Sequence, residues 1–343
     1  MTANPSTHGV GPSRLPLPLR DGFGRVHNNL RISVTDRCNL RCVYCMPEEV
    51  TFLDRAELLS FEEIVRFVRV AASLGIDKIR LTGGEPLLRR DLHRLVGMLA
   101  EVPGIRDLGL TTNGILLAEQ AQALFDAGLR RINVSLDTLD PVRFRQLARR
   151  DGLERVVAGI LAAKRAGFDP VKVNAVSIRG VTEHEVVPLA RFARAHGLEM
   201  RFIEYMPIGA DQWERNKVYF AHEILEQIER ELAPLVPVEP AAPQAPAQEF
   251  VYADGGGRVG IIASVSRPFC HSCNRLRLTS DGKLRNCLFA LDELDVKGLL
   301  RGGASDDDLA AVIRQSVATK WEGHEINTAR FVKPERTMHT IGG

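Results

Sequence analysis

The stretch Leu30–Pro47 reads LRISVTDRCNLRCVYCMP, a short β-rich run followed directly by three cysteines, Cys38, Cys42 and Cys45. The spacing C-x3-C-x2-C brings three thiolates together but supplies no fourth, whereas a cubic iron–sulfur cluster takes four cysteine ligands, one for each iron. We interpret the triplet as a site for a 4Fe-4S cluster with one iron open to a small molecule. A zinc site completed by a distant histidine and three unrelated core thiols are the alternatives.

The other three cysteines of the chain, Cys270, Cys273 and Cys287, form a second triplet with the spacing C-x2-C-x13-C. A disulfide framework is a poor explanation, because a chain of this length has core enough without covalent cross-links. We therefore predict two metal clusters, each with an open position. A cluster or zinc ion that only stabilises its domain is the alternative for the second triplet.

Length and composition define the class of protein. A chain of 343 residues exceeds what one hydrophobic core usually supports, so we expect one large domain and a smaller one. The formal net charge of +2 gives no bulk attraction to nucleic acid or to an anionic membrane, so neither is predicted as a partner, and an anionic ligand requires local arginines. Apolar runs long enough for a membrane span or a secretory signal are missing, and we expect a cytoplasmic location.

Between Leu30 and Tyr205 the sequence alternates β-rich runs with amphipathic helical stretches, which predicts an α/β fold with a parallel sheet, an incomplete (βα)6 TIM-type barrel. In such folds the chemistry collects at the carboxyl ends of the strands. The expected strands are Leu30–Val34, Lys78–Leu81, Asp107–Thr111, Arg131–Leu136, Val171–Ile178 and Met200–Tyr205. The expected helices are Phe61–Leu74, Leu92–Ala100, Ala118–Ala127, Leu153–Ala166 and Glu183–Ala195, and glycines that cap helix ends are Gly75, Gly128, Gly167 and Gly197.

Beyond Tyr205 the composition changes. A helix is expected around His222–Leu232, and a proline then occurs at every third position from Pro234 to Pro246, which predicts a polyproline II spacer rather than a docking motif. Further strands are expected at Arg258–Ala263, Leu276–Thr279 and Lys283–Arg285. The predicted organisation is a disordered tail (1–24, with an organellar transit segment as the alternative), a partial barrel (25–233), a proline-rich linker (234–248) and a smaller C-terminal iron–sulfur domain with a Gly-Gly tail (249–343).

Two motifs extend this interpretation by resemblance. The first triplet with Tyr44 between its last two cysteines, together with Gly83-Gly84-Glu85-Pro86 after the second predicted strand, resembles the radical S-adenosylmethionine (SAM) enzymes. The run Phe269–Leu288 around the second triplet is similar to the C-terminal cluster domain of the GTP 3',8-cyclase family of molybdenum cofactor biosynthesis. The resemblance covers residues 25–343.

The resemblance implies two 4Fe-4S clusters, ligated by the two cysteine triplets, and SAM bound at the open iron of the first. Glycine at positions 83 and 84 lets the backbone come close to the methionine part of SAM. The SAM-contacting residues that the family implies are Tyr44, Gly84, Ser135 and Met206. Taken alone, a tight turn or ordinary packing explains each of them.

The family also implies that the open iron of the second cluster binds the guanine of GTP. GTP is strongly anionic, and the planar fork of arginine suits phosphate oxygens. Arg275 and Arg277 are two apart on a predicted strand and point to one face, where a solvated basic surface is the alternative. The implied substrate residues are Arg31, Arg80, Thr111, Lys172, Arg201, Arg275, Leu276 and Arg277, and the Gly342-Gly343 tail is a further candidate for entry into the site.

The implied reaction is the radical SAM cyclisation of GTP to (8S)-3',8-cyclo-7,8-dihydroguanosine 5'-triphosphate, the first step of molybdenum cofactor biosynthesis. A 5'-deoxyadenosyl radical removes hydrogen from C3' of GTP, and the carbon radical closes onto C8 of guanine. The implied partners are GTP, an electron donor, a downstream cyclic pyranopterin monophosphate synthase and a second copy of the chain in a homodimer. The alternatives are a radical SAM enzyme with an auxiliary cluster that acts on a peptide, and a non-catalytic metal-cluster binding protein.

Overall fold

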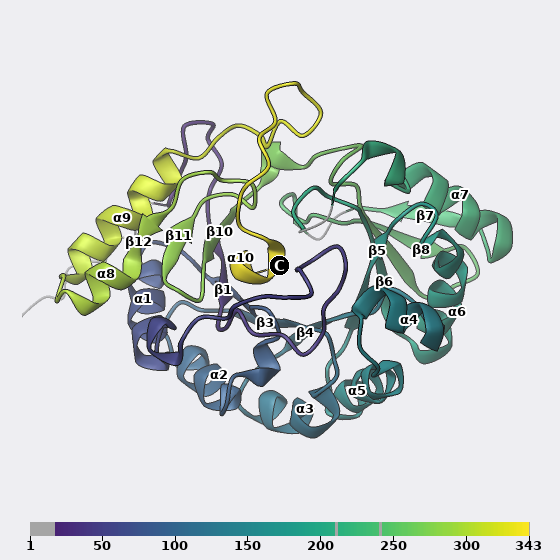
Figure 1. The fold of residues 1–343 in the computed structure, drawn as a ribbon, viewed down its shortest axis with the longest axis horizontal. Coiled ribbons are helices and arrows are strands. Elements are labelled where there is room, and N and C mark those ends of the chain that lie inside the picture. Colours follow the sequence, from purple (N-terminus) through teal and green to yellow (C-terminus); the bar gives the residue numbers. More distant parts are fainter. Residues whose placement is uncertain (1–17, 210–211, 240–241, 343) are drawn as a thin grey trace, which may run out of the picture.

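A computed structural model describes residues 18–209, 212–239 and 242–342 of the chain. Its centre is a curved sheet of six parallel strands that neighbour one another in chain order (Figure 1). Alternate residues of these strands are buried on the side that faces the helices, as expected when helices cover a parallel sheet. The strands are β1 (Asn29–Ser33), β2 (Lys78–Thr82), β3 (Asp107–Thr112), β4 (Arg131–Ser135), β5 (Val171–Ser177) and β6 (Glu199–Glu204).

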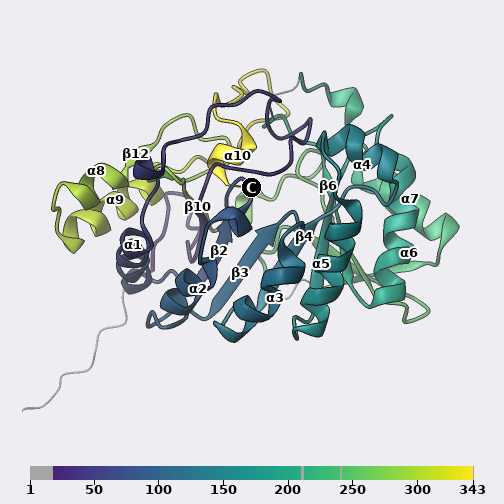
Figure 2. The ribbon, with the colours of Figure 1, turned by 60° about the horizontal axis from the view of Figure 1, so that its bottom comes forward.

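Helices cover the outer, convex face of this sheet, as Figures 1 and 2 show. They are α1 (Phe61–Ser73), α2 (Leu92–Ala100), α3 (Leu117–Asp126), α4 (Pro141–Ala148), α5 (Leu153–Arg165), α6 (Val186–His196) and α7 (Ala221–Glu231). The predicted capping glycines are confirmed, because all four have positive φ, from +59° to +106°. The sequence prediction missed α4, although Asp140 caps it and Pro141 occupies its first turn.

The C-terminal part of the chain extends the same sheet at both edges. β9 (Arg258–Ile262) pairs parallel with β6, and β10 (Arg275–Leu278) pairs parallel with β1. β8 (Gln248–Tyr252), β7 (Leu235–Val238), β11 (Lys283–Arg285) and β12 (Leu294–Asp295) add antiparallel strands outside them, which gives the order β12-β11-β10-β1-β2-β3-β4-β5-β6-β9-β8-β7. The predicted α/β fold with a TIM-type partial barrel is confirmed, and its two parts share one sheet.

Two expectations from the sequence are wrong in part. The proline-rich stretch does not form a continuous spacer, because Leu235–Val238 is the edge strand β7 and pairs antiparallel with β8. Proline is tolerated there because one side of an edge strand needs no ladder hydrogen bonds. The expected disordered tail is ordered from residue 18 onward, since Leu19 is buried and Arg20 bridges to Val26; residues 1–17 lie outside the described part.

The last residues return to the middle of the molecule. After α8 (Val296–Arg301) and α9 (Asp306–Ala318), the short helix α10 (Met338–Ile341) places Gly342 near the centre of the barrel, where Figure 1 marks the C-terminus. Gly342 has a φ of +85°, and an added Cβ would lie 2.9 Å from Thr82 Cγ2 and 3.1 Å from Ser33 Cβ. A larger residue at this position is therefore disfavoured by the positive φ and by steric clash with Thr82 and Ser33.

Within the described residues, no helix has the length and apolar character needed to span a bilayer.

The shared sheet predicts that the two parts unfold together. A chain that ends after Glu231 loses β9 and β10, and with them the buried side chains of Val259, Ile261, Leu276 and Leu278. Each such side chain contributes about 1.5–3 kcal/mol, against a total stability of about 5–15 kcal/mol for a domain. We expect one cooperative unfolding transition for the full chain in urea, followed by circular dichroism, and no cooperative transition for the truncated chain. An independent transition at a similar midpoint would contradict this.

Candidate active site

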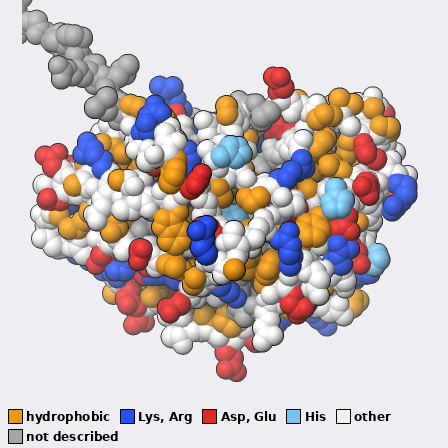
Figure 3. Space-filling model, turned by 90° about the horizontal axis from the view of Figure 1, so that it is seen from above, with side chains coloured by type: hydrophobic (Ala, Val, Ile, Leu, Met, Phe, Trp, Pro, Cys, Tyr) orange, Lys and Arg blue, Asp and Glu red, His pale blue; other side chains and the backbone are white. Residues whose placement is uncertain are grey.

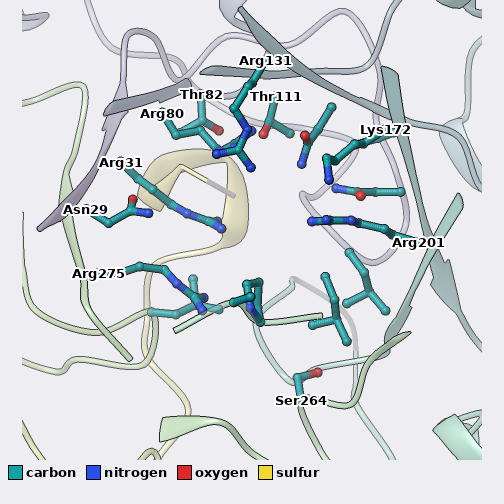
Figure 4. Close-up of a pocket in the computed structure, with 18 of the residues that line it drawn as sticks. Asn29, Arg31, Arg80, Thr82, Thr111, Arg131, Lys172, Arg201, Ser264 and Arg275 are labelled. Carbon is teal, nitrogen blue, oxygen red and sulfur yellow. The ribbon is translucent and has the colours of Figure 1, made fainter. Parts of the chain in front are cut away.

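One large cavity of about 1060 Å3 runs through the barrel and is lined by all six cysteines. Figure 4 shows basic side chains pointing into it from several strands. Every cysteine is a free thiol, and within each triplet the thiols are near enough to influence one another's pKa. The thiols of each triplet thus lie in one region of the cavity, although no three His, Cys, Asp or Glu side chains of the described residues lie close enough to hold a single metal ion. The site residues expected from the sequence that line the cavity, besides the cysteines, are Tyr44, Gly84, Ser135, Met206, Arg31, Arg80, Thr111, Lys172, Arg201, Arg275 and Arg277.

The two triplets lie at opposite ends of the barrel. The first follows the carboxyl end of β1, whereas Cys270 and Cys273 precede β10, which runs parallel to β1 with Asn29 opposite Arg275. Cys287 follows β11, which is antiparallel to β10 and so ends at the same level. Only the first triplet occupies the carboxyl edge that the fold class predicts. The cavity extends between the two triplets.

The first triplet is held by close packing of two loops. Gly84 N donates to Thr35 O at 2.7 Å, and Glu85 N donates to Arg37 O at 2.7 Å. A Cβ on Gly83 would lie 2.5 Å from Thr35 O, and one on Gly84 would collide with Arg37 O. The two glycines are thus required for contact between the loops, whatever they contribute to ligand binding.

Glu85 organises the loop that contacts the first triplet. Its fully buried carboxylate accepts hydrogen bonds from Thr112 Oγ1 (2.7 Å), Leu87 N (2.9 Å) and Asn113 N (2.6 Å). Asn113 Nδ2 in turn reaches Cys38 Sγ at 3.7 Å. Burial raises the pKa of Glu85 to about 7, and the three hydrogen bonds oppose the rise. Glu85 is part of the GGEP motif, but no feature of the sequence indicated this role.

Tyr44 is held by a hydrogen bond to Asp137, which follows the end of β4. Its hydroxyl donates to Asp137 Oδ2, and Asp137 Oδ1 accepts from Val176 N at 2.8 Å. Asp137 follows β4, two residues after Ser135, so Tyr44 and Ser135 are tied to the same strand end. Burial raises the pKa of Tyr44 well above its ordinary value, which keeps its hydroxyl protonated as a donor.

The second triplet rests on a segment that no motif identifies, Lys320–His324. Lys320 Nζ donates to Cys273 Sγ at 3.6 Å. Gly323 packs against the same loop, because a Cβ added to it would lie 3.8 Å from Cys270 Sγ. Arg25 binds the carbonyls of Cys270 (2.8 Å) and Glu322 (2.8 Å) and so joins the N-terminal segment to this cluster loop.

The two triplets differ in electrostatic surroundings. Burial raises the pKa of Cys38 to about 11 and also raises that of Cys42 well above its ordinary value. Burial acts in the same direction on Cys273, but the charges of Arg275 and Lys320 outweigh it and lower the pKa to about 7. The cationic surroundings of Cys273 therefore favour its thiolate, whereas burial raises the pKa of Cys270.

A row of arginines crosses neighbouring strands at one level of the barrel. Arg277 of β10 pairs with Arg31 of β1, which pairs with Arg80 of β2. Burial and the adjacent Arg277, Arg275 and Arg80 lower the pKa of Arg31 well below its usual range. A guanidinium stays protonated in proteins, so this shift is an unfavourable interaction that a bound anion relieves. None of these four has an acidic partner within ion-pair distance in the described part of the chain.

Lys172 and Arg201, on the other side of the cavity (Figure 4), are already paired. Glu199 accepts from Lys172 Nζ at 2.6 Å and from Arg201 Nε at 2.6 Å, and Arg201 also pairs with Glu249 at 3.0 Å. Any phosphate bound here competes with these carboxylates. The side of the cavity with Arg31, Arg80 and Arg275 is the stronger anion site.

Leu276 differs from its neighbours. Its side chain is 1% exposed and belongs to the hydrophobic core, because alternate residues of β10 face opposite sides. A contact of Leu276 with substrate therefore comes from its backbone. Additional polar residues that line the cavity and were not predicted include Asn29, Lys78, Arg131, Asn133, Asn174 and Ser264.

Glu85→Gln tests the support of the first triplet. Glutamine has one acceptor oxygen where the carboxylate uses two, so a buried N–H loses its partner, which costs about 1–3 kcal/mol. We expect the free energy of unfolding to fall by this amount in urea and the iron bound after anaerobic reconstitution to decrease. The exposed Glu119→Gln in α3 is the control. Unchanged stability and iron in Glu85→Gln would show that the Asn113 loop does not need the carboxylate.

Comparison with known proteins agrees with this geometry. The family described as the Radical SAM superfamily matches residues 32–193, and the family described as Molybdenum Cofactor Synthesis C matches residues 198–326. Among solved structures, Streptococcus suis SuiB bound to its precursor peptide SuiA has a TM-score of 0.63 at 17% identity, covering 91% of this chain and 74% of SuiB. At that identity the likeness shows the fold alone.

Curated relatives extend over nearly the whole chain. The GTP 3',8-cyclase of Rhodopirellula baltica is 48% identical over 333 residues, which are 96% of this chain and 93% of the relative. The GTP 3',8-cyclase of Thermodesulfovibrio yellowstonii is 45% identical over 327 residues, 95% of this chain and 100% of the relative. Two cysteine triplets at opposite ends of a cationic barrel and this degree of identity lead to one conclusion: the chain belongs to the GTP 3',8-cyclase family of radical SAM enzymes.

Proposed function

We propose that Cys38, Cys42 and Cys45 ligate the cluster that binds SAM, and that Cys270, Cys273 and Cys287 ligate the cluster that meets the guanine of GTP. The protein is a radical SAM GTP 3',8-cyclase with two 4Fe-4S clusters, and it forms (8S)-3',8-cyclo-7,8-dihydroguanosine 5'-triphosphate in the first step of molybdenum cofactor biosynthesis. The observation that supports the ligand assignment best is the placement of both triplets on one cavity.

The residues between the triplets orient the substrate. Arg31, Arg80 and Arg275 form the phosphate site in this proposal, because they face the cavity and lack acidic partners among the described residues. Thr111, Lys172, Arg201, Arg277 and the backbone of Leu276 complete the GTP site. Tyr44, Gly84, Ser135 and Met206 contact SAM at the carboxyl end of the barrel. This arrangement places the ribose of GTP between the two ends.

The first cluster and SAM together supply, when bound, the radical that removes the C3' hydrogen of GTP. The protein contributes positioning: strands hold the arginines rigidly, and a rigid anion site fixes the distance from C3' to the SAM end of the cavity. Walls of the barrel restrict access of water and other hydrogen donors to the reacting carbon. Arg277 donates to the carbonyl of Gly342, which keeps the C-terminal tail at the SAM end near Ser33 and Thr82.

The proposal also covers partners and organisation. We propose that the protein receives electrons from an external donor, passes its product to a downstream cyclic pyranopterin monophosphate synthase, forms a homodimer and is located in the cytoplasm. We further propose a division into a barrel (25–233), a connecting segment (234–248) and a C-terminal cluster domain (249–343). On the face shown in Figure 3, acidic and basic side chains are interspersed, which agrees with the proposed absence of nucleic acid and membrane as partners.

Anaerobic reconstitution tests the proposal. We expect about eight irons per chain, as two cubes of four, and 5'-deoxyadenosine formation that requires GTP. Substitution of any cysteine in one triplet by serine is expected to remove about four irons and to leave the other cluster in place. About four irons in the unsubstituted chain, or SAM cleavage that is indifferent to GTP, would overturn the assignment.

Arg275→Ala tests the phosphate site. Loss of a charge-assisted contact of about 1.5–3 kcal/mol predicts GTP binding that is weaker by roughly 10- to 150-fold, while iron content stays unchanged. Equilibrium binding of GTP to the reconstituted enzyme measures this, and the exposed Arg155→Ala in α5 serves as the control. Loss of iron in Arg275→Ala with retained GTP affinity would make Arg275 a structural support of the cluster loop instead.

A further inference from the structure

Lys320 is a buried cation that the GTP and SAM sites do not use. It follows α9, is 5% exposed, and does not line the cavity. A lysine ammonium is rarely buried to this degree without a specific arrangement of partners. Its location, behind the second cysteine triplet as seen from the cavity, gives it access to the cluster loops without contact to substrate.

The contacts of Lys320 join the loops that carry two of the three cysteines. Nζ donates to Arg275 O at 2.8 Å, to Asn286 O at 2.7 Å and to Cys273 Sγ at 3.6 Å. Arg275 lies two residues after Cys273, and Asn286 directly precedes Cys287. An ammonium group has three donors, and each has an acceptor here. Lys320 therefore fixes the Cys273 loop and the Cys287 loop relative to each other.

The charge of Lys320 is directed at sulfur rather than at a carboxylate. Within the described ranges no acidic side chain lies at ion-pair distance from Nζ, so its charge is not neutralised nearby. In the first triplet, Cys38 Sγ accepts from the backbone of Leu40 at 3.4 Å and from the neutral amide of Asn113. Hydrogen bonds and positive charge at cluster sulfurs raise the reduction potential, and buried charges are screened little by salt.

We propose that Lys320 is a positioning residue of the second cluster, which holds the Cys273 and Cys287 loops in register and stabilises the reduced cluster through its charge at Cys273. The proposal rests on the assignment of Cys270, Cys273 and Cys287 as cluster ligands. It concerns the second cluster, because both loops that Lys320 contacts carry cysteines of the second triplet.

Lys320→Met removes the charge and the donors and keeps the length of the side chain. The reconstituted holoenzyme is titrated with dithionite as the electron source, and the midpoint potential of each cluster is followed by electron paramagnetic resonance. The signal that GTP perturbs identifies the second cluster. We expect its oxidised-to-reduced equilibrium to shift about tenfold toward the oxidised form, about 59 mV for one electron, with the first cluster unchanged. Lys320→Arg keeps the charge, so we expect its midpoint potential for the second cluster to lie between those of the unsubstituted enzyme and Lys320→Met.

Lys283→Met is the matched control, because Lys283 lies in β11 of the same region and pairs with Asp295 at 3.2 Å. Selective loss of about four irons in Lys320→Met, with the first-cluster signal intact, also supports the proposal. Unchanged iron content and potential, or loss of both clusters, overturns it. If the unsubstituted enzyme itself binds only one cluster or shows no GTP-sensitive signal, then the ligand assignment has failed rather than the role of Lys320.

Discussion

The pairing of β9 and β10 with the two edges of the parallel sheet is the constraint on which the site depends. These strands come from the C-terminal part of the chain, yet they run parallel to β6 and β1. Because β10 begins where β1 begins, the cysteines just before β10 lie at the end of the barrel opposite Cys38, Cys42 and Cys45. The sheet thus separates the two clusters and leaves the substrate cavity between them.

Positive charge is distributed unequally around that cavity, so its two sides differ in how strongly they attract an anion. Arg31 and Arg80 lack acidic partners among the described residues, and their mutual repulsion is a cost of folding that a polyphosphate offsets. Lys172 and Arg201 are paired with Glu199, so an anion that contacts them gains less binding free energy than one that contacts Arg31 and Arg80. In the proposed site, a polyphosphate therefore gains more by binding on the β1–β2 side. The rigid sheet thus holds the arginines in a mutually repulsive arrangement that is already suited to binding an anion.

Local signals predicted the barrel well. Hydrophobic periodicity placed β1 to β6 within about one residue, and the glycines after α1, α3, α5 and α6 were recognisable because only glycine readily takes positive φ. Non-local features were not predictable in this way. The edge pairing of β7, the support of Cys38 by Glu85 through Asn113, and the contact of Lys320 with Cys273 depend on tertiary contacts that no sequence pattern indicates, even though Glu85 lies within a recognised motif. The two cysteine triplets were visible, but their placement at opposite ends required the strand order.

The position of Gly342 has a practical consequence for handling the protein. Its carbonyl accepts from Arg277 inside the barrel, and its Cα faces Ser33 and Thr82 with no space for a side chain. An affinity tag or fluorescent fusion attached beyond Gly342 has to leave from a buried position inside the barrel. Purification handles and spectroscopic labels belong on the amino-terminal side, because Pro18, the first described residue, is exposed.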